Sequence, residues 1–391
     1  MTIMFSARVP ATLAPNRLAR ALDARRASGR AVCDLTESNP TRVGLAYPED
    51  LLASLARPAG LRYEPTPFGL SAAREAVAGD YARLGARVPP GDVVLTTSTS
   101  ESYSMLFKLL CPAGSSILAP APSYPLLEHL ARLDAIDVDV FRLEYHGRWS
   151  VDIDSIRRAL TPATRAIVLV QPNNPTGSMA SGEEIAAIGE ICRMHDLALI
   201  VDEVFADYPL DGHAAAVPPT WPPDVLTFRL GGLSKSIGLP QVKLGWIAMS
   251  GPAAGLDQAR ARLELIGDTY LSVSTPVQLA AADLIDRGSD IRTQIQRRVA
   301  DNVRTVDRLL ERHPACQRLR AEAGWSCVVQ VPATRSEESL VLELLERDGV
   351  LVHPGYFFDF PREAFVVPSL IVPAVTLAVG VERLLRRADA A

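Results

Sequence analysis

The 391-residue chain lacks several features that would define a class of protein at once. It has no C-x-x-C pair, and its six histidines show no metal-ligand spacing, so the sequence predicts no metal site. No uncharged apolar run reaches the ~18 residues of a membrane span, and the N-terminal "MTIMFSARVPATLAP" lacks the pattern of a signal peptide. Its five cysteines are scattered, which is typical of reduced thiols. We therefore expect a cytoplasmic protein without a membrane partner.

The chain also lacks a strong charge of either sign. Its net charge is −5 with 22% charged residues, which gives no basic field for nucleic acid. Neither a G-x-G-x-x-G motif nor a P-loop is present, so dinucleotide and nucleoside-triphosphate binding are not favoured. What the chain does have is length and 48% hydrophobic residues, enough for a large core and, by its length, for two domains.

Short apolar, β-branched runs alternate with helical patterns through the middle of the chain. The helical patterns include 101–111 and 182–195, the second opened by Ser181 as an N-cap. The alternation predicts an α/β fold with a seven-stranded, mostly parallel sheet flanked by helices. The seven predicted strands are 92–98, 115–122, 137–143, 165–172, 197–204, 225–230 and 243–250.

The C-terminal part changes character. A helical run at 290–312 precedes three short apolar runs, and a last helix is predicted at 373–388. This pattern predicts a smaller α+β unit. The three predicted strands lie near 325–332, 350–355 and 365–370.

Polar residues follow five of the predicted strands, where the sites of parallel sheets lie. The cluster "TTSTSESYS" opens a helix after the first strand, as a phosphate cradle or as a plain N-cap cluster. Taken alone, the aromatic ring of Tyr124 after the second strand is more typical of core packing, and Asp202 could belong to a structural ion pair. The four residues after the later strands are Tyr124, Asn174, Asp202 and Lys235.

Together these groups suit pyridoxal 5′-phosphate. Its phosphate needs N–H and hydroxyl donors, and its ring needs a flat stacking partner. The pyridine nitrogen needs a carboxylate that keeps it protonated, and the aldehyde needs a lysine whose neutral amine is accessible.

The motifs "SNPT", "PNNPTG", "DEVF" and "SKSIGLPQVKLGW", in this order, resemble the fold type I pyridoxal-phosphate enzymes, and more narrowly the class I/II aminotransferases. The resemblance runs from about residue 15 to 388. It implies a large cofactor-binding domain at 46–289 and a small domain formed by 1–45 and 290–391. It also implies a homodimer with shared active sites that moves an amino group from an amino acid to a 2-oxo acid by a ping-pong route.

The resemblance assigns roles to individual residues. Lys235 would form the Schiff base with the cofactor and then shuttle a proton, and Asp202 would pair with the pyridinium nitrogen. Asn174 would donate to the ring O3′, with a cis bond to Pro175 as in relatives. The other implied contacts are Tyr124 stacked on the ring, Ser98, Thr99 and Ser100 at the phosphate, Tyr63 reaching the phosphate of the partner subunit, and Asn39 bordering the substrate.

The phosphate and ring contacts depart from the family pattern at three positions. Lys243 stands where an arginine usually binds the phosphate, and it supplies charge without a bidentate fork. Gly232 replaces a serine, whereas Ser98 adds a hydroxyl back. Phe205 lacks the tyrosine hydroxyl that normally donates to O3′, so we expect the Schiff base to hold its proton more tightly.

The substrate contacts depart further. Val367 stands where relatives place the arginine that binds the substrate carboxylate. Arg362 could substitute for it or could be a surface arginine. Asp268 could favour a basic substrate side chain or could be a helix cap or surface acid.

Two other functions compete with transamination. A lyase, cyclase or decarboxylase-like reaction on the same cofactor is the alternative that the missing arginine suggests. A ligand-sensing domain of a transcription regulator is less favoured, because the fold begins almost at once and the chain is acidic.

Overall fold

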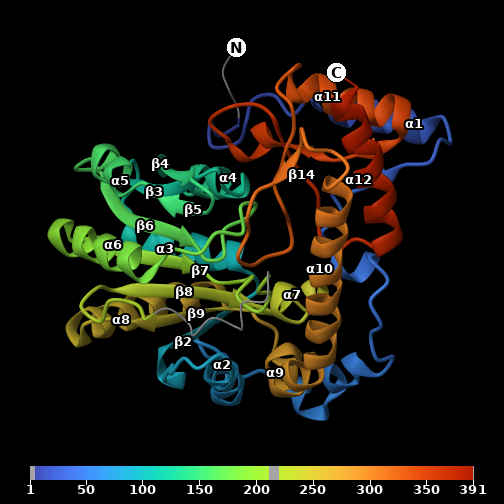
Figure 1. Cartoon of the computed structure of the whole chain (residues 1–391). Coiled ribbons are helices and arrows are strands. Elements are labelled where there is room, and N and C mark those ends of the chain that lie inside the picture. The colour runs from blue at the N-terminus through green and yellow to red at the C-terminus, as the bar shows by residue number, and fades with distance from the viewer. Residues whose placement is uncertain (1–4, 211–219, 391) are drawn as a thin grey trace.

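The computed structural model describes residues 5–210 and 220–390 and places an eight-stranded sheet at the centre of the molecule (Figure 1). The strands follow the spatial order β2-β9-β8-β7-β6-β3-β4-β5. Their bounds, in that order, are Val93–Thr96, Gly245–Ser250, Thr227–Gly232, Ala198–Asp202, Thr164–Val170, Ser116–Ala121, Asp137–Tyr145 and Trp149–Val151.

Most neighbouring strands are parallel. The run from β8 through β7, β6 and β3 to β4 is parallel throughout. Strand β9 is antiparallel to both β8 and β2, so β2 points the same way as β8. The carboxyl ends of β2, β3, β6, β7 and β8 therefore lie along one edge of the sheet, which is where the sequence predicts the site.

The predicted α/β sheet is confirmed, but its strand count is one too low. All seven predicted strands are present, and the additional one is β5. This strand has only three residues and pairs antiparallel with β4 after a tight turn in which the amide of His146 donates to the carbonyl of Arg148. Three residues are too few to show an alternating pattern in the sequence.

Helices cover both faces of the sheet. In β6, Val168 packs with α3, α4 and α8, whereas its neighbour Ile167 packs with α5 and α6 on the other face. The period-2 alternation of a strand sends successive apolar side chains into two separate cores. The helices are α3 (Thr99–Leu110), α4 (Leu126–Leu133) and α8 (Ala253–Tyr270) on one face, and α5 (Ile153–Ala159) and α6 (Gly182–His195) on the other.

A smaller part of the structure joins segments from both ends of the chain. Strand β1 (Cys33–Asp34) pairs in parallel with β12 (Val350–Leu351). In Figure 1 the long helix α10 stands beside the large sheet, and α1, α11 and α12 gather toward the top right. The domain boundaries remain a prediction, and residues 1–4 and 391 of the predicted small domain lie outside the described residues.

The predicted C-terminal elements are present with adjusted bounds. The four-stranded antiparallel sheet has the order β10-β11-β14-β13, with bounds Gln317–Arg318, Val329–Gln330, Phe365–Val367 and His353–Pro354. The remaining α-helices are α1 (Arg17–Ala27), α2 (Ser71–Arg83), α7 (Leu233–Ser236), α9 (Thr275–Arg287), α10 (Ser289–Leu310), α11 (Glu337–Glu343) and α12 (Ala374–Asp389). Short 3-10 segments are η1 (Pro40–Arg42), η2 (Leu51–Ala56), η3 (Pro58–Leu61), η4 (Pro90–Asp92), η5 (Pro240–Val242) and η7 (Gly355–Phe358), and η6 (Leu344–Asp348) is a π-helical turn. Within the described ranges, no helix combines the length and the apolar composition that crossing a bilayer requires.

Glu184 ties the unpredicted strand β5 to helix α6. Ser181 caps α6, and the Glu184 carboxylate accepts from the Ser181 amide at 2.6 Å to complete a capping box. The same carboxylate accepts from the amide of Val151 in β5 at 2.7 Å and from Arg148 at 3.1 Å. The Glu184 side chain therefore provides an acceptor both for a backbone amide at the start of α6 and for a backbone amide of the edge strand β5.

We predict that Glu184→Ala lowers the free energy of unfolding by about 2 kcal/mol, because two backbone amides and one guanidinium lose their acceptor. The measurement is denaturant unfolding followed by tryptophan fluorescence. The control is Glu183→Ala in the same helical turn, where an exposed acid contributes less than about 1 kcal/mol through the helix dipole. Equal losses in the two variants would contradict the role given to Glu184.

Candidate active site

A cavity of about 270 Å³ lies at the carboxyl edge of the large sheet. Its walls come from the start of α3, the segments after β3, β6 and β7, the short helix α7, and Trp325 and Ser326 of the C-terminal part. Eight of the residues that the sequence proposes for the site line this cavity. They are Ser98, Thr99, Ser100, Tyr124, Asn174, Asp202, Phe205 and Lys235.

Lys235 lies in α7, directly after β8, among aromatic side chains. Its Nζ lies 4.9 Å from the ring centroid of Trp325 and 5.7 Å from that of Phe205. Burial lowers the pKa of Lys235 to about 8, and the charge of Asp202 opposes this shift. A neutral amine is therefore far more accessible near pH 7 than in an exposed lysine, which is what a nucleophilic lysine requires.

Asp202 is the last residue of β7. Its Oδ2 accepts from the Tyr103 hydroxyl at 3.2 Å, and its Oδ1 accepts from the Val204 amide at 3.2 Å. Burial raises the pKa of Asp202 to about 6, although both hydrogen bonds oppose the shift. The carboxylate is thus oriented from two sides, and a cationic partner in the cavity would stabilise its charged form.

The N-terminus of α3 opens onto the cavity. Ser98 is the N-cap, and its Oγ accepts from the Glu101 amide at 3.2 Å, so this hydroxyl is engaged in capping. The first-turn amides of Thr99 and Ser100 have no helical carbonyl to bond, and such amides bind anions. Ser234 adds a hydroxyl to the cavity wall.

A glycine makes room for the backbone at this end of the cavity. A Cβ on Gly245 would lie 2.9 Å from the carbonyl carbon of Ser98, closer than side chains pack. Strand β9 can therefore approach the start of α3 only with glycine at this position.

Tyr124 and Asn174 approach the cavity from the loops after β3 and β6. The Tyr124 side chain is 49% exposed and offers a ring to a ligand, and burial of its hydroxyl raises its pKa. The Asn174–Pro175 peptide is cis, the isomer that the resemblance implies.

Three other proposed residues lie outside this cavity. Lys243 is exposed and has a left-handed backbone with φ of +58°. The Asn39 side chain accepts from the Thr41 amide at 3.0 Å, and its neighbour Ser38 lines the cavity instead. Tyr63 is 72% exposed and borders a separate small cleft with Tyr270.

The candidates for substrate recognition are also placed elsewhere. Arg362 is exposed, with its guanidinium 5.2 Å from the ring centroid of Phe365. Val367 is buried in β14, and Asp268 is exposed on α8. Among the described residues that line the cavity there is no arginine and no histidine.

The sequence analysis missed several residues of the cavity. Tyr103 lies four residues after Thr99 and hence on the same face of α3, a spacing that could have identified it. Trp325 comes from the C-terminal part, and no local pattern indicates that it contacts Lys235. The other missed polar residues are Ser38, Ser123, Ser234 and Ser326.

Comparison with known proteins gives one family. The model of the aminotransferases of class I and II matches residues 34–369 of this chain. The chain belongs to the class I and II aminotransferase family. It is accordingly an enzyme that transfers amino groups, and its family uses pyridoxal phosphate.

Individual relatives agree with this assignment. The glutamate-pyruvate aminotransferase AlaA of Escherichia coli K12 is 29% identical over 352 residues, which cover 85% of this chain and 84% of the relative. The alanine aminotransferase of Mycobacterium tuberculosis H37Rv is 27% identical over 92% of this chain and 86% of its own. These relatives do not favour the lyase or cyclase alternative.

Solved structures show the same fold. An aminotransferase from Escherichia coli superposes with a TM-score of 0.85 at 24% identity, over 100% of this chain and 99% of its own. The alanine aminotransferase of Pyrococcus furiosus gives a TM-score of 0.85 at 22% identity, over 96% of both chains.

We predict that, in cofactor-free protein, the Lys235 amine titrates with a midpoint near pH 8. Asp202→Asn should move the midpoint lower still, because the carboxylate charge opposes the effect of burial. The measurement is the pH dependence of Lys235 acetylation, quantified by mass spectrometry of its peptide. Asp268→Asn, an exposed acid on α8, is the control and should leave the midpoint unchanged. A wild-type midpoint near the ordinary 10.5 would refute the prediction.

Proposed function

We propose that this aminotransferase binds pyridoxal 5′-phosphate in the cavity and moves an amino group from an amino acid to a 2-oxo acid by a ping-pong mechanism. One observation carries the proposal. The Lys235 amine and the Asp202 carboxylate are buried in the same cavity onto which the first-turn amides of α3 open. Amine, carboxylate and anion site are the three groups that this cofactor requires of a protein.

The residues present fit the cofactor. Thr99, Ser100 and Ser234 would hold the phosphate, in a space that Gly245 keeps open. Asp202 would bind the protonated pyridine nitrogen, and this cation would in turn hold the carboxylate in its charged form. The remaining contacts would be Tyr124 on the ring face, Asn174 at O3′, the apolar Phe205 beside it and the backbone of Ser98. Lys243, which is exposed outside the cavity, would add a more distant positive charge.

When bound, the cofactor supplies a carbonyl that accepts an amine and a ring that accepts electrons. Lys235 supplies the proton transfers, because an amine with a pKa near 8 can both take and return a proton near neutral pH. Asp202 and Tyr103 hold their geometry through the 3.2 Å hydrogen bond between them. The aromatic wall of Trp325 and Phe205 excludes water from one side of the amine.

A homodimer with shared active sites is part of this proposal. Tyr270, which lines the Tyr63 cleft, is 55% exposed. Leu61 and Leu265, close in sequence to residues of this cleft, are 93% and 72% exposed, and a second copy would cover these apolar side chains. Tyr63 would then reach the cofactor phosphate of the other subunit. All five cysteines are free thiols, which is compatible with the predicted cytoplasmic location.

The cavity wall suggests how the substrate carboxylate binds without an arginine from this chain. Ser38, Asn174 and Ser326 line the cavity, and their side chains carry hydroxyl and amide groups. These neutral donors are weaker than a bidentate guanidinium, so we expect a modest affinity for the amino donor. Because two relatives are named for alanine or for glutamate and pyruvate, these compounds are the first substrates to examine.

The proposal predicts the spectrum of the purified protein. Wild-type protein loaded with pyridoxal phosphate should show the band of a lysine-bound cofactor, and single amino acids without any oxo acid should convert it to the pyridoxamine band. Lys235→Ala should lack the first band while still binding the cofactor phosphate. A wild-type protein without any cofactor band, or one whose band never converts with alanine, glutamate or other donors, would overturn the proposal.

We further predict that Ser326→Ala raises the KM for the amino donor several-fold with little change in kcat, because one neutral donor to the carboxylate is lost. Arg362→Gln should leave the KM within about twofold, because the Arg362 side chain is exposed and stacked on Phe365. Steady-state kinetics of both variants give the answer. A large rise in KM with Arg362→Gln and none with Ser326→Ala would show instead that Arg362 binds the substrate carboxylate.

A further inference from the structure

Helix α7, which carries Lys235, is too short to be stabilised by its own backbone hydrogen bonds. Helix α7 has only the four residues Leu233–Ser236, and its N-cap, Gly232, has no side chain that could cap it. A single turn leaves nearly all its carbonyls without helical partners, and it gains little from helical cooperativity. The position of the Lys235 backbone must therefore be set by groups outside α7.

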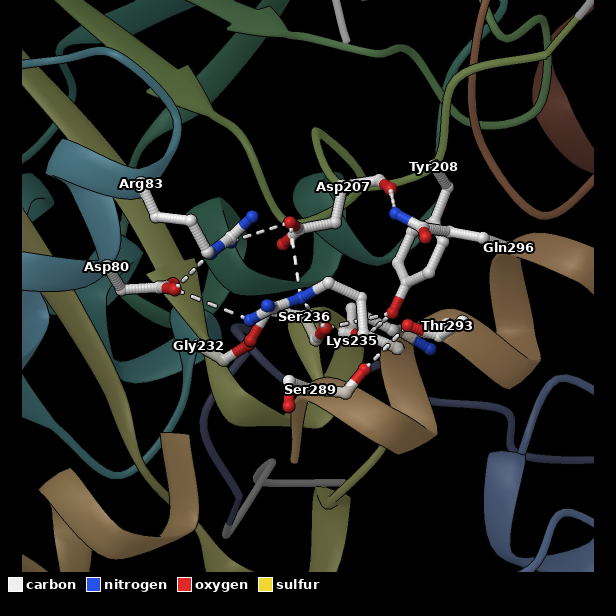
Figure 2. A network of polar contacts seen from close by, with 11 residues as sticks. Asp80, Arg83, Asp207, Tyr208, Gly232, Lys235, Ser236, Ser289, Thr293 and Gln296 are labelled. Carbon is white, nitrogen blue, oxygen red and sulfur yellow. Dashed lines mark hydrogen bonds and ion pairs between the residues drawn. The ribbon is translucent and has the colours of Figure 1, made fainter. Parts of the chain in front are cut away.

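Tyr208 supplies one of these groups. Its hydroxyl lies 2.5 Å from the carbonyl oxygen of Lys235 and 3.0 Å from that of Ser236, so its single proton is shared between them. The side chain is 1% exposed, and Figure 2 shows the hydroxyl pointing at this turn. Tyr208 does not line the cofactor cavity, so it contacts the main chain of the lysine and not its reactive end.

Arg292 of α10 supplies the second group. Its Nε donates to the carbonyl oxygen of Ser236 at 3.0 Å, and the whole side chain is buried. The Nε also lies 3.2 Å from Asp207, and Nη2 lies 3.3 Å from Asp80. Both carboxylates also accept from Arg83, at 2.8 and 2.7 Å. Arg292 is thus fixed in a closed ring of two arginines and two aspartates.

This ring joins separate parts of the chain at α7. Asp80 and Arg83 belong to α2, Arg292 belongs to α10, and Asp207 lies five residues after Asp202. Gln296, one turn further along α10, donates to the Asp207 carbonyl at 2.7 Å. The segment after Asp202 and the turn that carries Lys235 are therefore both bonded to this buried ring of arginines and aspartates.

We infer that Tyr208 and Arg292 are positioning residues that hold the Lys235 amine at the reacting distance inside the cavity. The inference rests on the proposed function of Lys235 and goes beyond it, because neither residue lines the cofactor cavity. Reactions between bound groups are sensitive to misplacements of about 1 Å, which can cost on the order of a hundredfold in rate. A loosened α7 should slow every step that uses the amine far more than it weakens cofactor binding, because Ser234 is the only residue of α7 among the proposed phosphate contacts.

The test uses full-length protein with Tyr208→Phe, which removes only the hydroxyl. Its control is Tyr81→Phe, which removes a buried hydroxyl that accepts from the Trp246 indole at 3.3 Å instead of donating to a carbonyl of α7. We expect Tyr208→Phe to lower kcat and the rate of capture of added pyridoxal phosphate by at least about tenfold. Capture is measured by borohydride trapping and peptide mapping. Affinity for pyridoxine phosphate, which has no aldehyde, should fall by much less than the capture rate, because Thr99 and Ser100 of α3 keep their proposed contacts with the phosphate.

A second pair tests the arginine. Arg292→Lys keeps a charge for Asp80 and Asp207 but loses the guanidinium donation to Ser236, and it should slow capture as Tyr208→Phe does. Its control is Arg298→Lys on the same helix, where the arginine donates to the carbonyls of Val43 and Ile371. If Tyr208→Phe fails to fold, this pair carries the test.

Two outcomes overturn the inference in distinguishable ways. Equal kcat and capture rates in test and control variants, with thermal stability lowered alike, would mean that the network only stabilises the fold. Trapped cofactor on a residue other than Lys235 in the wild type would overturn the proposed function, and this inference with it.

Discussion

The burial of an amine and a carboxylate in one cavity is the constraint on which the rest of the structure depends. Neither Lys235 nor Asp202 would be stable as an isolated charge there, and burial shifts their pKa values toward each other, to about 8 and about 6. Each charge partly opposes the shift of the other. The parallel strands β7 and β8 bring the two residues to one edge, and the aromatic rings of Phe205 and Trp325 keep water away from the amine.

Much of the site could be predicted from the sequence because it lies at strand ends. The residue that follows a buried parallel strand must emerge at the carboxyl edge, so a linear pattern fixes a spatial neighbourhood. Asp202, Asn174 and Lys235 were accessible to this reasoning. Tyr103 and Trp325 do not follow a strand: Tyr103 reaches the cavity from the face of α3, where only helix spacing indicates it, and Trp325 comes from a distant part of the chain. The strand β5 was not predicted because its three residues are too few to show an alternating pattern in the sequence.

Two positions that were assigned by resemblance alone lie outside the cavity. A matched position places a backbone but does not orient a side chain, especially in a loop. Lys243 aligns with a phosphate-binding arginine, yet it lies exposed on a left-handed residue outside the cavity wall. Asn39 directs its side chain to the turn of which it is the cap, and Ser38 lines the cavity instead. Local hydrogen bonds thus compete with the cofactor site for the same polar groups.

The buried ring beneath α7 can fix the lysine without disturbing its chemistry. Its two arginines and two aspartates sum to no net charge, and Arg292 joins the ring to the turn by donating to the main-chain carbonyl of Ser236. The pKa of Lys235 is lowered by burial, and Asp202 opposes this shift. A single unpaired arginine at the same place would hold the turn equally well, but it would disfavour the charged amine and would be costly to bury. Closing the ring with Asp80 and Arg83 separates the two tasks, because position is set on one side of the turn and proton affinity on the other.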